Sequence, residues 1–179
     1  MSVASRQAHW DHIYGTKDEV ALSWFQENLA IPIEWIMQER PNFDAAIIDV
    51  GGGTSRLVDS LLNRGFQHLS VLDISVEALG KSKVRLGAQA VLVEWICTDV
   101  TTWIPSSQYW LWHDRAVFHF LTEAQDRDAY ISALRRAILP GGRIMIASFS
   151  LDGPEKCSNL PVCRYSHESL TQELGVGFE

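Results

Sequence analysis

The sequence predicts an α/β fold in which a doubly wound, mostly parallel sheet carries helices on both faces. Three observations lead to this prediction. Short apolar runs alternate with segments of helical periodicity along most of the 179 residues. A Gly51-Gly52-Gly53 turn separates an apolar run from the helical segment that follows it. A helix after a strand is the usual crossover between parallel strands. Four runs end beside an aspartate, at Asp49, Asp73, Asp99 and Asp114.

Length and composition predict one globular domain. A chain of 179 residues can bury one substantial core but is short for two ordinary domains. Hydrophobic residues make up 46% of it, yet no apolar run approaches the roughly 20 residues that a membrane span needs. The N-terminus lacks the apolar core of a signal peptide. We therefore expect a cytoplasmic protein that does not enter a membrane.

Charge and cysteine content narrow the range of partners. The formal net charge is −7, and no basic cluster is larger than Arg135-Arg136, which argues against a surface for nucleic acid. Cys97, Cys157 and Cys163 are odd in number and show no spacing typical of a metal site. We expect reduced, mostly structural thiols, no metal, and a small molecule or a protein as partner.

Residues 1–42 are predicted to form a helical cap. Trp10 and Tyr14 are four residues apart, so a short helix would place both rings on one face. Trp24 and Phe25 follow in a segment with the pattern of an exposed aromatic pair. This region either packs on one end of the sheet or gates a site there.

Residues 43–179 are predicted to form the core of the domain. Ser75 and Thr122 are predicted to be helix N-caps. Pro140-Gly141-Gly142 is predicted to end a helix. A long loop is expected over residues 150–166. The predicted strands are residues 45–50, 69–72, 90–96, 108–112 and 143–149, and the predicted helices are residues 32–38, 54–63, 76–86, 123–139 and 167–174.

The aspartates and the glycine run together predict a ligand site, because ligands of such sheets bind outside the carboxyl ends of the strands. The spacing from Gly53 to Asp73 suits the ribose of either a dinucleotide or a nucleoside. A dinucleotide fingerprint needs a third glycine where this chain has Arg56, and a pyrophosphate would not favour Asp49 beside the loop. A nucleoside with an amino-acid arm, such as S-adenosylmethionine, suits several carboxylates better.

Several segments, in this order and at these distances, resemble the motifs of class I S-adenosylmethionine-dependent methyltransferases. The resemblance covers about residues 10–178. The four main motifs are Asp49-Val50-Gly51-Gly52-Gly53-Thr54-Ser55, Leu72-Asp73-Ile74-Ser75, Thr98-Asp99-Val100 and Leu139-Pro140-Gly141-Gly142.

Two further segments resemble subgroups of that family. Trp10-Asp11-His12-Ile13-Tyr14, with Ser23-Trp24-Phe25, is similar to the N-terminal segment of a bacterial subgroup. The fourth predicted strand carries His113-Asp114-Arg115-Ala116 and then Phe118-His119-Phe120-Leu121. This pattern resembles thiopurine and thiol methyltransferases and, more distantly, a group of protein-lysine methyltransferases.

The resemblance implies a Rossmann-like methyltransferase fold and a set of site residues. The methionine arm would lie by the glycine loop, the ribose on the second aspartate and the adenine by the third. Independently of the resemblance, the aromatic residues Trp10, Tyr14, Trp24 and Phe25 could shape the acceptor pocket by contact with a sulfonium. His119 is a further candidate for contact with the acceptor. The implied cofactor residues are Asp49, Gly51, Gly52, Gly53, Asp73, Ile74, Asp99, Val100, Trp10 and Tyr14, and the implied catalytic residues are His113, Asp114 and Arg115.

The sequence departs from the family pattern in two places. Ser55 stands where the glycine loop usually has its third glycine. The sheet of the family continues with a sixth strand and an antiparallel seventh, whereas this sequence ends at Glu179, where the sixth should begin. We therefore expect a fragment with five strands, whose fifth strand is an open edge that a second copy could complete.

The predicted function is methyl transfer from S-adenosylmethionine to a small thiol or heterocycle, or to a protein lysine. Such an in-line displacement mainly requires positioning, and it needs a base only if the acceptor arrives protonated. A non-catalytic cofactor-binding module is the alternative. An oxidoreductase that binds NAD(P) is disfavoured by Arg56.

Overall fold

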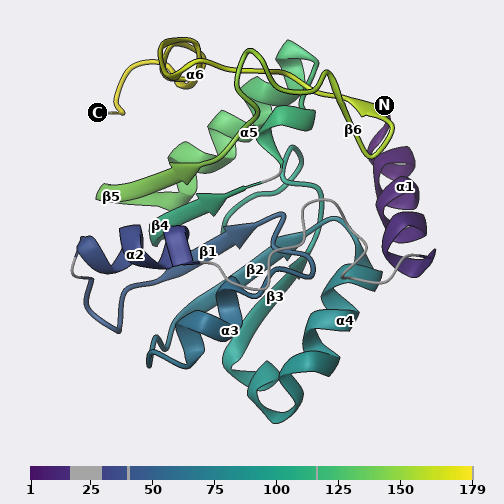
Figure 1. The fold of residues 1–179 in the computed structure, drawn as a ribbon. Coiled ribbons are helices and arrows are strands. Elements are labelled where there is room, and N and C mark those ends of the chain that lie inside the picture. The colour runs from purple at the N-terminus through teal and green to yellow at the C-terminus, as the bar shows by residue number, and fades with distance from the viewer. Residues whose placement is uncertain (17–29, 40, 116, 179) are drawn as a thin grey trace.

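The computed structural model describes residues 1–16, 30–39, 41–115 and 117–178, and it confirms the predicted α/β fold (Figure 1). Five parallel strands form one sheet in the order β3-β2-β1-β4-β5. This order, with the first strand in the centre, is a doubly wound topology. The strands are β1 Ile47–Val50, β2 Leu69–Asp73, β3 Val93–Cys97, β4 Tyr109–Asp114 and β5 Ile138–Ile146.

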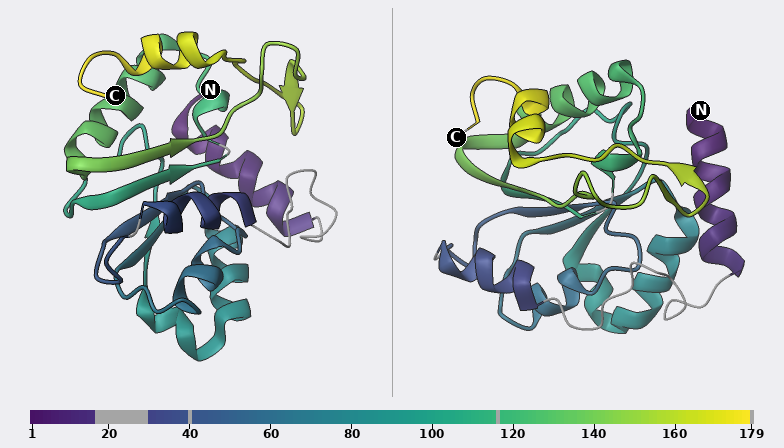
Figure 2. Two further views of the ribbon diagram at one scale, coloured as in Figure 1. Left: turned by 60° about the vertical axis from the view of Figure 1, so that its left-hand side comes forward. Right: turned by 45° about the horizontal axis from the view of Figure 1, so that its top comes forward.

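Helices cover both faces of the sheet, and α1 stands across the carboxyl ends of the strands (Figures 1 and 2). Helices α2, α3 and α4 pack on one face, and α5 and α6 on the other. The helices are α1 Val3–Thr16, α2 Ala30–Gln38, α3 Leu57–Leu62, α4 Val76–Leu86, α5 Ala124–Ala137 and α6 His167–Leu174, with the short 3₁₀ helices η2 Gly87–Leu92 and η3 Phe118–Phe120.

Two apolar clusters, one on each face, form the core. Successive strand residues point to opposite faces, so Ile47 and Leu111 join the cluster under α3 while Ile48 and Trp112 join the cluster under α5. All four side chains are at most 2% exposed. The central strands are therefore buried on both faces, as expected of a parallel sheet.

Helix starts agree with the sequence in one place and disagree in another. The hydroxyl of Ser75 accepts a hydrogen bond from the backbone N–H of Ala78, so Ser75 is the predicted N-cap of α4. Thr122 was predicted to cap the next helix, but α5 begins at Ala124 with Glu123 as its N-cap residue. Arg127 of α5 instead donates to the carbonyl of Thr122, so the backbone of Thr122 is used in place of its side chain.

Several predicted boundaries differ from the structure. Helix α3 starts at Leu57, three residues late, since Thr54 belongs to the turn after β1. Helix α2 starts at residue 30, two residues early. Strand β3 starts at Val93 because η2 takes up the preceding residues, and the loop predicted for residues 150–166 contains a hairpin of β6 Lys156–Cys157 and β7 Leu160–Pro161.

The stop at Pro140-Gly141-Gly142 acts differently from the prediction. Helix α5 already ends at Ala137, and residues 138–142 belong to an irregular start of β5. The register shifts there, because Tyr109 pairs with Ile138 but Leu111 pairs with Arg143. A side chain at Gly142 would lie 2.9 Å from the carbonyl of Trp110, so only glycine allows this close approach.

Strand β5 is the edge strand that the sequence predicted. The C-terminal segment is fixed to α5, where Arg135 stacks on Phe178 at 4.5 Å and donates to the carbonyls of Leu174 and Val176. Association of this edge with a second copy stays a prediction.

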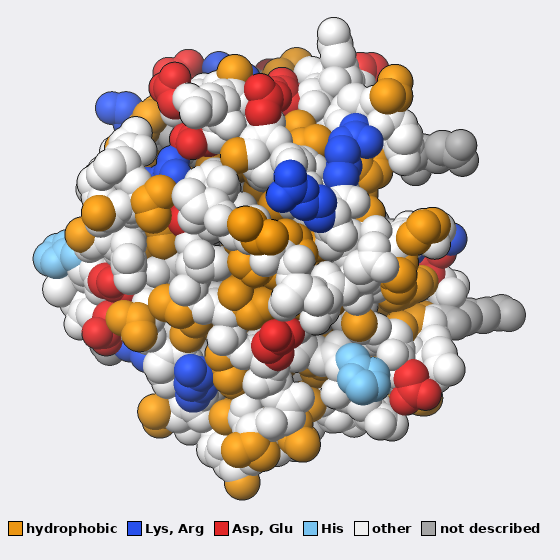
Figure 3. Space-filling model, turned by 180° about the vertical axis from the view of Figure 1, so that it is seen from behind, with side chains coloured by type: hydrophobic (Ala, Val, Ile, Leu, Met, Phe, Trp, Pro, Cys, Tyr) orange, Lys and Arg blue, Asp and Glu red, His pale blue; other side chains and the backbone are white. Residues whose placement is uncertain are grey.

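On the side shown in Figure 3, basic side chains are scattered among acidic and hydrophobic ones and form no continuous basic patch. Within the described residues, no helix is both long enough and apolar enough to cross a membrane.

A buried hydrogen-bond chain joins the end of β4 to α5. The indole N–H of Trp112 donates to the hydroxyl of Tyr130 at 2.8 Å, and that hydroxyl donates to Asp114 Oδ2 at 2.6 Å. The carboxylate also accepts from the backbone N–H groups of Val117 and Phe118. Each member of the chain satisfies its neighbours, so it holds the segment after β4 in place.

We expect Tyr130→Phe to lower the free energy of unfolding by about 1–3 kcal/mol, because it leaves a buried indole N–H without a partner and removes a donor from a buried carboxylate. Urea denaturation followed by circular dichroism would measure this change. A loss smaller than about 0.5 kcal/mol would contradict the assigned role, since conservative surface substitutions have effects of that size.

Candidate functional site

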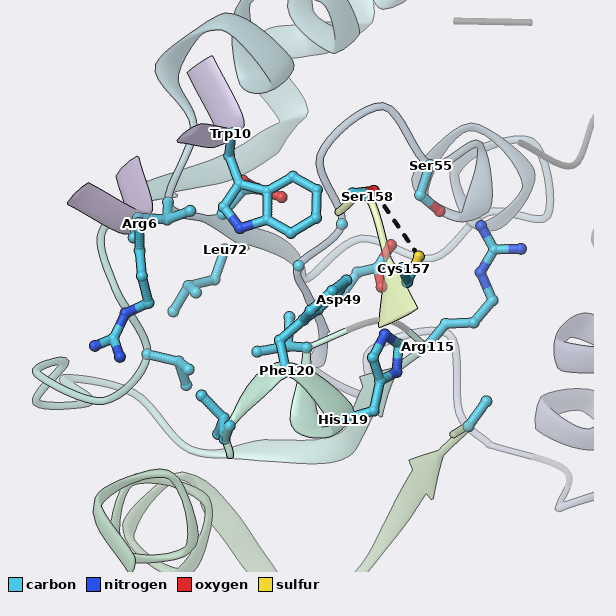
Figure 4. Close-up of a pocket in the computed structure, with 18 of the residues that line it drawn as sticks. Arg6, Trp10, Asp49, Ser55, Leu72, Arg115, His119, Phe120, Cys157 and Ser158 are labelled. Carbon is cyan, nitrogen blue, oxygen red and sulfur yellow. Dashed lines mark hydrogen bonds between the residues drawn. The ribbon is translucent and has the colours of Figure 1, made fainter. Parts of the chain in front are cut away.

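A cavity of about 610 Å³ opens at the carboxyl ends of the strands, between α1 and the β6–β7 hairpin (Figure 4). Its volume lies within the range of small-molecule pockets. The sequence-predicted site residues line it, apart from Gly53 and Asp114. The lining residues that were predicted are Trp10, Tyr14, Asp49, Gly51, Gly52, Asp73, Ile74, Asp99, Val100, His113 and Arg115.

The glycine turn after β1 forms the floor of the cavity in a conformation that requires glycine. Gly51 and Gly53 have φ angles of +67° and +39°, in the left-handed region. A side chain on Gly51 would meet Val117 at 2.2 Å, and one on Gly53 would lie 2.9 Å from Asp73 Oδ2. The turn therefore brings the backbone directly beside the second aspartate.

Two backbone N–H groups of this turn bind the neighbouring strand. Gly51 and Gly52 both donate to the carbonyl of Leu72, at 2.7 and 3.2 Å. These two bonds tie the loop to β2. Ser55, at the position of the usual third glycine, accepts a hydrogen bond from the backbone N–H of Leu57 and so helps to start α3.

Helix α4 holds the same loop from its other side. The hydroxyl of Ser82 donates to the carbonyl of Gly53 at 2.6 Å, and Arg85 donates to the carbonyls of Thr54 and Ser55 at 3.1 and 2.8 Å. Arg85 also makes a two-bond ion pair with Asp59 of α3. Sequence reasoning missed Ser82 and Arg85, because the residues that support a loop from a later helix carry no local motif.

Asp49 carries an unsatisfied oxygen in the floor of the cavity. Its Oδ1 lies 2.7 Å from His113 Nδ1, which the parallel register of β1 and β4 places opposite it. Its Oδ2 is buried and has no hydrogen-bond partner among the described residues. A buried carboxylate oxygen without a donor is unfavourable, so a ligand that presents a cationic amino group would stabilise this site.

Asp73 is buried at the end of β2, where it is 5% exposed. The pKa of its carboxyl is raised from 3.8 to about 7. Burial is the main cause, and the nearby charges of Asp49 and Asp11 act in the same direction, whereas a hydrogen bond from the backbone N–H of Ser75 lowers the pKa. Hydroxyl donors of a ribose would favour the ionised form.

Asp99 is engaged from two sides. Its Oδ1 accepts from the backbone N–H and the hydroxyl of Thr101, at 2.8 and 2.6 Å, and its Oδ2 accepts from Arg6 Nε at 2.8 Å. Arg6 also pairs with Asp126 at 2.7 Å. Sequence reasoning missed Arg6, since a single arginine near a terminus has no distinguishing pattern. The contact of Asp99 with an adenine amine stays a prediction.

Helix α1 forms one wall of the cavity. Besides the Arg6 contacts, Asp11 Oδ1 accepts a hydrogen bond from the hydroxyl of Ser75 at 2.7 Å. The rings of Trp10 and Tyr14 lie on one face, 6.2 Å apart, and Trp10 contacts Phe120 edge-on at 5.0 Å. Of the predicted cap, α1 is thus a packed wall of the site and α2 packs on one face of the sheet, while Trp24 and Phe25 lie outside the described residues.

The structure corrects the role expected for Asp114. This residue is fully buried in the chain that joins Trp112 to Tyr130, and it does not line the cavity. Arg115 and His119, which follow it, do line the cavity. The segment after β4 therefore presents a guanidinium and an imidazole in place of the expected carboxylate.

The β6–β7 hairpin closes the side of the cavity next to His119. Ser158 and Asn159 at its tip have positive φ angles of 52° and 64°, which suits a two-residue hairpin turn. The backbone N–H of Cys163 donates to the carbonyl of His119 at 2.7 Å and anchors the hairpin segment. The three cysteines are free thiols, as predicted, and Cys157 lines the cavity. Across the described ranges, no group of three or more possible ligands is arranged to hold a metal ion.

A sequence profile described as a methyltransferase domain matches residues 47–142, which is more than half of the chain. The chain belongs to this methyltransferase family. The match covers β1 to β4 and includes the glycine turn and the three cavity aspartates. Membership confirms the prediction of a class I methyltransferase that uses S-adenosylmethionine, and it leaves the NAD(P)-binding alternative without support. The cavity fits that cofactor, because its aspartates offer acceptors for an amino group and a ribose.

Among its relatives, this methyltransferase is similar to EEF1A lysine methyltransferase 2 of Homo sapiens, with 22% identity over 99% of this chain and 76% of that protein. The protein of the same name from Danio rerio is 24% identical over 96% of this chain and 74% of its own length.

Solved structures share the fold of this methyltransferase. A structure titled "DhpI-SAM-HEP complex" has a TM-score of 0.72 and 16% identity. The alignment covers 96% of this chain and 86% of the DhpI chain. The glycopeptide N-methyltransferase MtfA with S-adenosylmethionine has a TM-score of 0.61 and 17% identity over 74% of this chain. The chain spans only 59% of the MtfA chain. None of the relatives named here is a thiopurine or thiol methyltransferase.

Substitution of Asp73 by asparagine is expected to change the pH dependence of stability. The unfolded chain releases the Asp73 proton near pH 4 and the folded, ligand-free protein near pH 7, so the free energy of unfolding falls between these values by up to about 1.4 kcal/mol per pH unit. Asp73→Asn removes this contribution. Urea titrations should show a stability advantage for the variant that is near zero at about pH 4 and greatest above pH 7.

The same variant should bind S-adenosylhomocysteine at least about tenfold more weakly at pH 8, because an amide replaces the carboxylate that is predicted to accept hydrogen bonds from the ribose hydroxyls. Calorimetry with Asp44→Asn, an exposed aspartate, provides the matched control. Equal affinities of Asp73→Asn and the wild type would show that the ribose lies elsewhere.

Proposed function

We propose that this protein transfers the methyl group of S-adenosylmethionine to a nucleophile on a small molecule, a thiol or a heterocyclic nitrogen. The observation that carries this proposal is the set of buried carboxylates at the ends of β1, β2 and β3, of which Asp49 has an oxygen without a partner among the described residues. In this arrangement Asp49 would bind the amino group of the cofactor, Asp73 its ribose and Asp99 its adenine.

The proposed cofactor position assigns the acceptor to the other half of the cavity. The cofactor residues belong to β1, β2 and β3, so the part of the cavity beside β4 and the hairpin remains for the acceptor. Figure 4 shows Arg115, His119 and Cys157 together at that side, away from Arg6. When bound, the cofactor supplies a methyl group on a positively charged sulfur.

The side chains on the acceptor side favour a neutral or anionic nucleophile. In the described part of the chain, the carboxylates that line the cavity are Asp49, Asp73 and Asp99, which all belong to the proposed cofactor half. Arg115 and Lys156 bring positive charge to the acceptor half. A nearby positive charge stabilises a thiolate and lowers the pKa of the bound thiol, whereas an ammonium group would be disfavoured.

The remaining work of the protein is to position the acceptor and exclude water. Phe120 and Phe149 give the acceptor half apolar surface, and Trp10 packs against Phe120 at 5.0 Å. Holding an acceptor in line with the reacting methyl group can itself supply a large part of the rate enhancement.

A protein lysine is the second candidate acceptor. The support for it is that the relatives named EEF1A lysine methyltransferase 2 align with 96–99% of this chain. A lysine side chain would have to reach the cavity past the hairpin and lose its proton before it could react.

We also propose a cytoplasmic location and self-association through the edge of β5. The three free cysteines suit a reducing compartment, and the unpaired edge of β5 offers a ladder for a second strand. Gel filtration with light scattering tests the second point, and a monomer at all concentrations would disprove it.

Incubation of the protein with methyl-labelled S-adenosylmethionine and three acceptor sets tests the function: simple thiols, nitrogen heterocycles and lysine-containing peptides. We expect labelled product from the first or second set and none from the third. Label on lysine alone would favour the second candidate. Tight cofactor binding without any turnover would favour a non-catalytic binding module.

A further inference from the structure

His119 has a property that the proposed cofactor contacts do not explain. Its side chain is only 4% exposed, and neither ring nitrogen has a hydrogen-bond partner among the described residues. Buried polar atoms are nearly always paired, because an unpaired one costs stability. A residue that retains two such atoms at the wall of a cavity points to a ligand that completes them.

The packing around His119 holds the ring in one place. Its centroid lies 4.3 Å from that of Phe120 and 4.9 Å from that of Phe149. The backbone carbonyl of His119 accepts from Cys163, so the hairpin segment fixes the same turn. A phenylalanine ring could fill this slot equally well, which means that packing alone does not require an imidazole.

The same burial sets the protonation state of the ring. Desolvation lowers the pKa of His119 from 6.5 to about 4, so the imidazole is neutral at pH 7. A neutral imidazole offers one N–H donor and one nitrogen acceptor. It can therefore accept a hydrogen bond from an S–H or N–H group of a bound molecule.

The position of His119 in the fold separates it from the cofactor half of the cavity. It follows β4, whereas the three aspartates proposed for the cofactor lie in β1, in β2 and just after β3. In Figure 4 the His119 ring lies on the side of Arg115 and Cys157, and Arg6 marks the opposite side.

We propose that His119 is a catalytic residue that hydrogen-bonds to the S–H or N–H group of the acceptor and takes its proton during methyl transfer. This inference rests on the function proposed above. A bond forms between the sulfur or nitrogen of the acceptor and the methyl carbon, while the bond from that carbon to the sulfonium breaks and its electron pair stays on the departing thioether. The acceptor proton passes to the free nitrogen of His119 and then to water.

A weakly basic imidazole is sufficient for this step. The proton of a thiol becomes strongly acidic once its sulfur forms a bond to the methyl carbon, so even a buried histidine can take it. Neutrality of the ring beforehand keeps the acceptor nitrogen available across the range of physiological pH.

The first test compares His119→Phe, His119→Gln and the exposed control His68→Gln. We expect His119→Phe to bind S-adenosylhomocysteine within about twofold of the wild type, to melt no lower, and to lose about tenfold or more in kcat/KM for a thiol or heterocyclic acceptor. His119→Gln, which keeps a donor and an acceptor, should recover part of the loss. Unchanged kcat/KM in His119→Phe would overturn the proposal.

A second test observes the ring directly and does not depend on turnover. Protein labelled with ¹⁵N-histidine and saturated with S-adenosylhomocysteine is titrated with thiophenol or benzimidazole, and the ring nitrogen resonances of His119 should shift while those of His68 stay. Binding of S-adenosylhomocysteine with no shift by either probe would overturn the role of His119 and leave the cofactor assignment standing. Failure to bind S-adenosylhomocysteine would instead overturn the proposed function, and this inference with it.

Discussion

The site depends above all on the close contact between the glycine turn and β2. The backbone N–H groups of Gly51 and Gly52 donate to the carbonyl of Leu72 and hold the turn against β2. Gly53 therefore lies next to the carboxylate of Asp73. No residue with a side chain could make this approach at Gly51 or Gly53. Because the turn is held so closely, two buried carboxylates from adjacent strands, Asp49 and Asp73, share the floor of one cavity.

Buried carboxylates of this kind lower the stability of the ligand-free protein and favour the binding of a ligand that satisfies them. Asp73 resists ionisation in the ligand-free protein, and Asp49 keeps one oxygen without a partner among the described residues. A ligand with an amino group and a ribose would relieve both penalties at once. Relief of this unfavourable free energy would contribute to the affinity for the cofactor. Perturbed carboxyl groups of this kind are common at functional sites.

Helix α1 forms one wall of the cavity at the carboxyl ends of the strands. Arg6 bridges Asp99 and Asp126, and Asp11 binds the hydroxyl that caps α4. These contacts couple the N-terminal helix to the same strand ends that carry the proposed cofactor residues. Occupancy of the cavity and the docking of α1 are therefore expected to reinforce each other, because they share Asp99.

The two halves of the cavity differ in chemistry. The half over β1 to β3 is acidic and suits a cofactor with amino and hydroxyl groups, whereas the half beside β4 presents a guanidinium, a neutral imidazole and an aromatic wall. Asp114, which the sequence suggested for the acceptor half, supports the segment after β4 from below through its buried hydrogen bonds.

The sequence by itself determined the class of fold, the central part of the site and the family. Local patterns were enough for these, because alternating apolar runs, a glycine turn and an aspartate at the end of four of the five strands depend on residues close together in the chain. The predicted cap at Ser75 and the pairing of Trp10 with Tyr14 also rest on spacings of three and four residues, and both are present.

Only the tertiary structure decided which of the candidate side chains reach the cavity. Asp114 and His119 are five residues apart, and nothing local distinguishes them, but packing against Tyr130 takes the first into the core while the turn of η3 sets the second at the cavity wall. Arg6, Ser82 and Arg85 were found only in the structure for the same reason, since each contacts residues at least 26 positions away along the chain. Such contacts depend on how helices pack on the sheet, and short-range sequence patterns do not predict that packing.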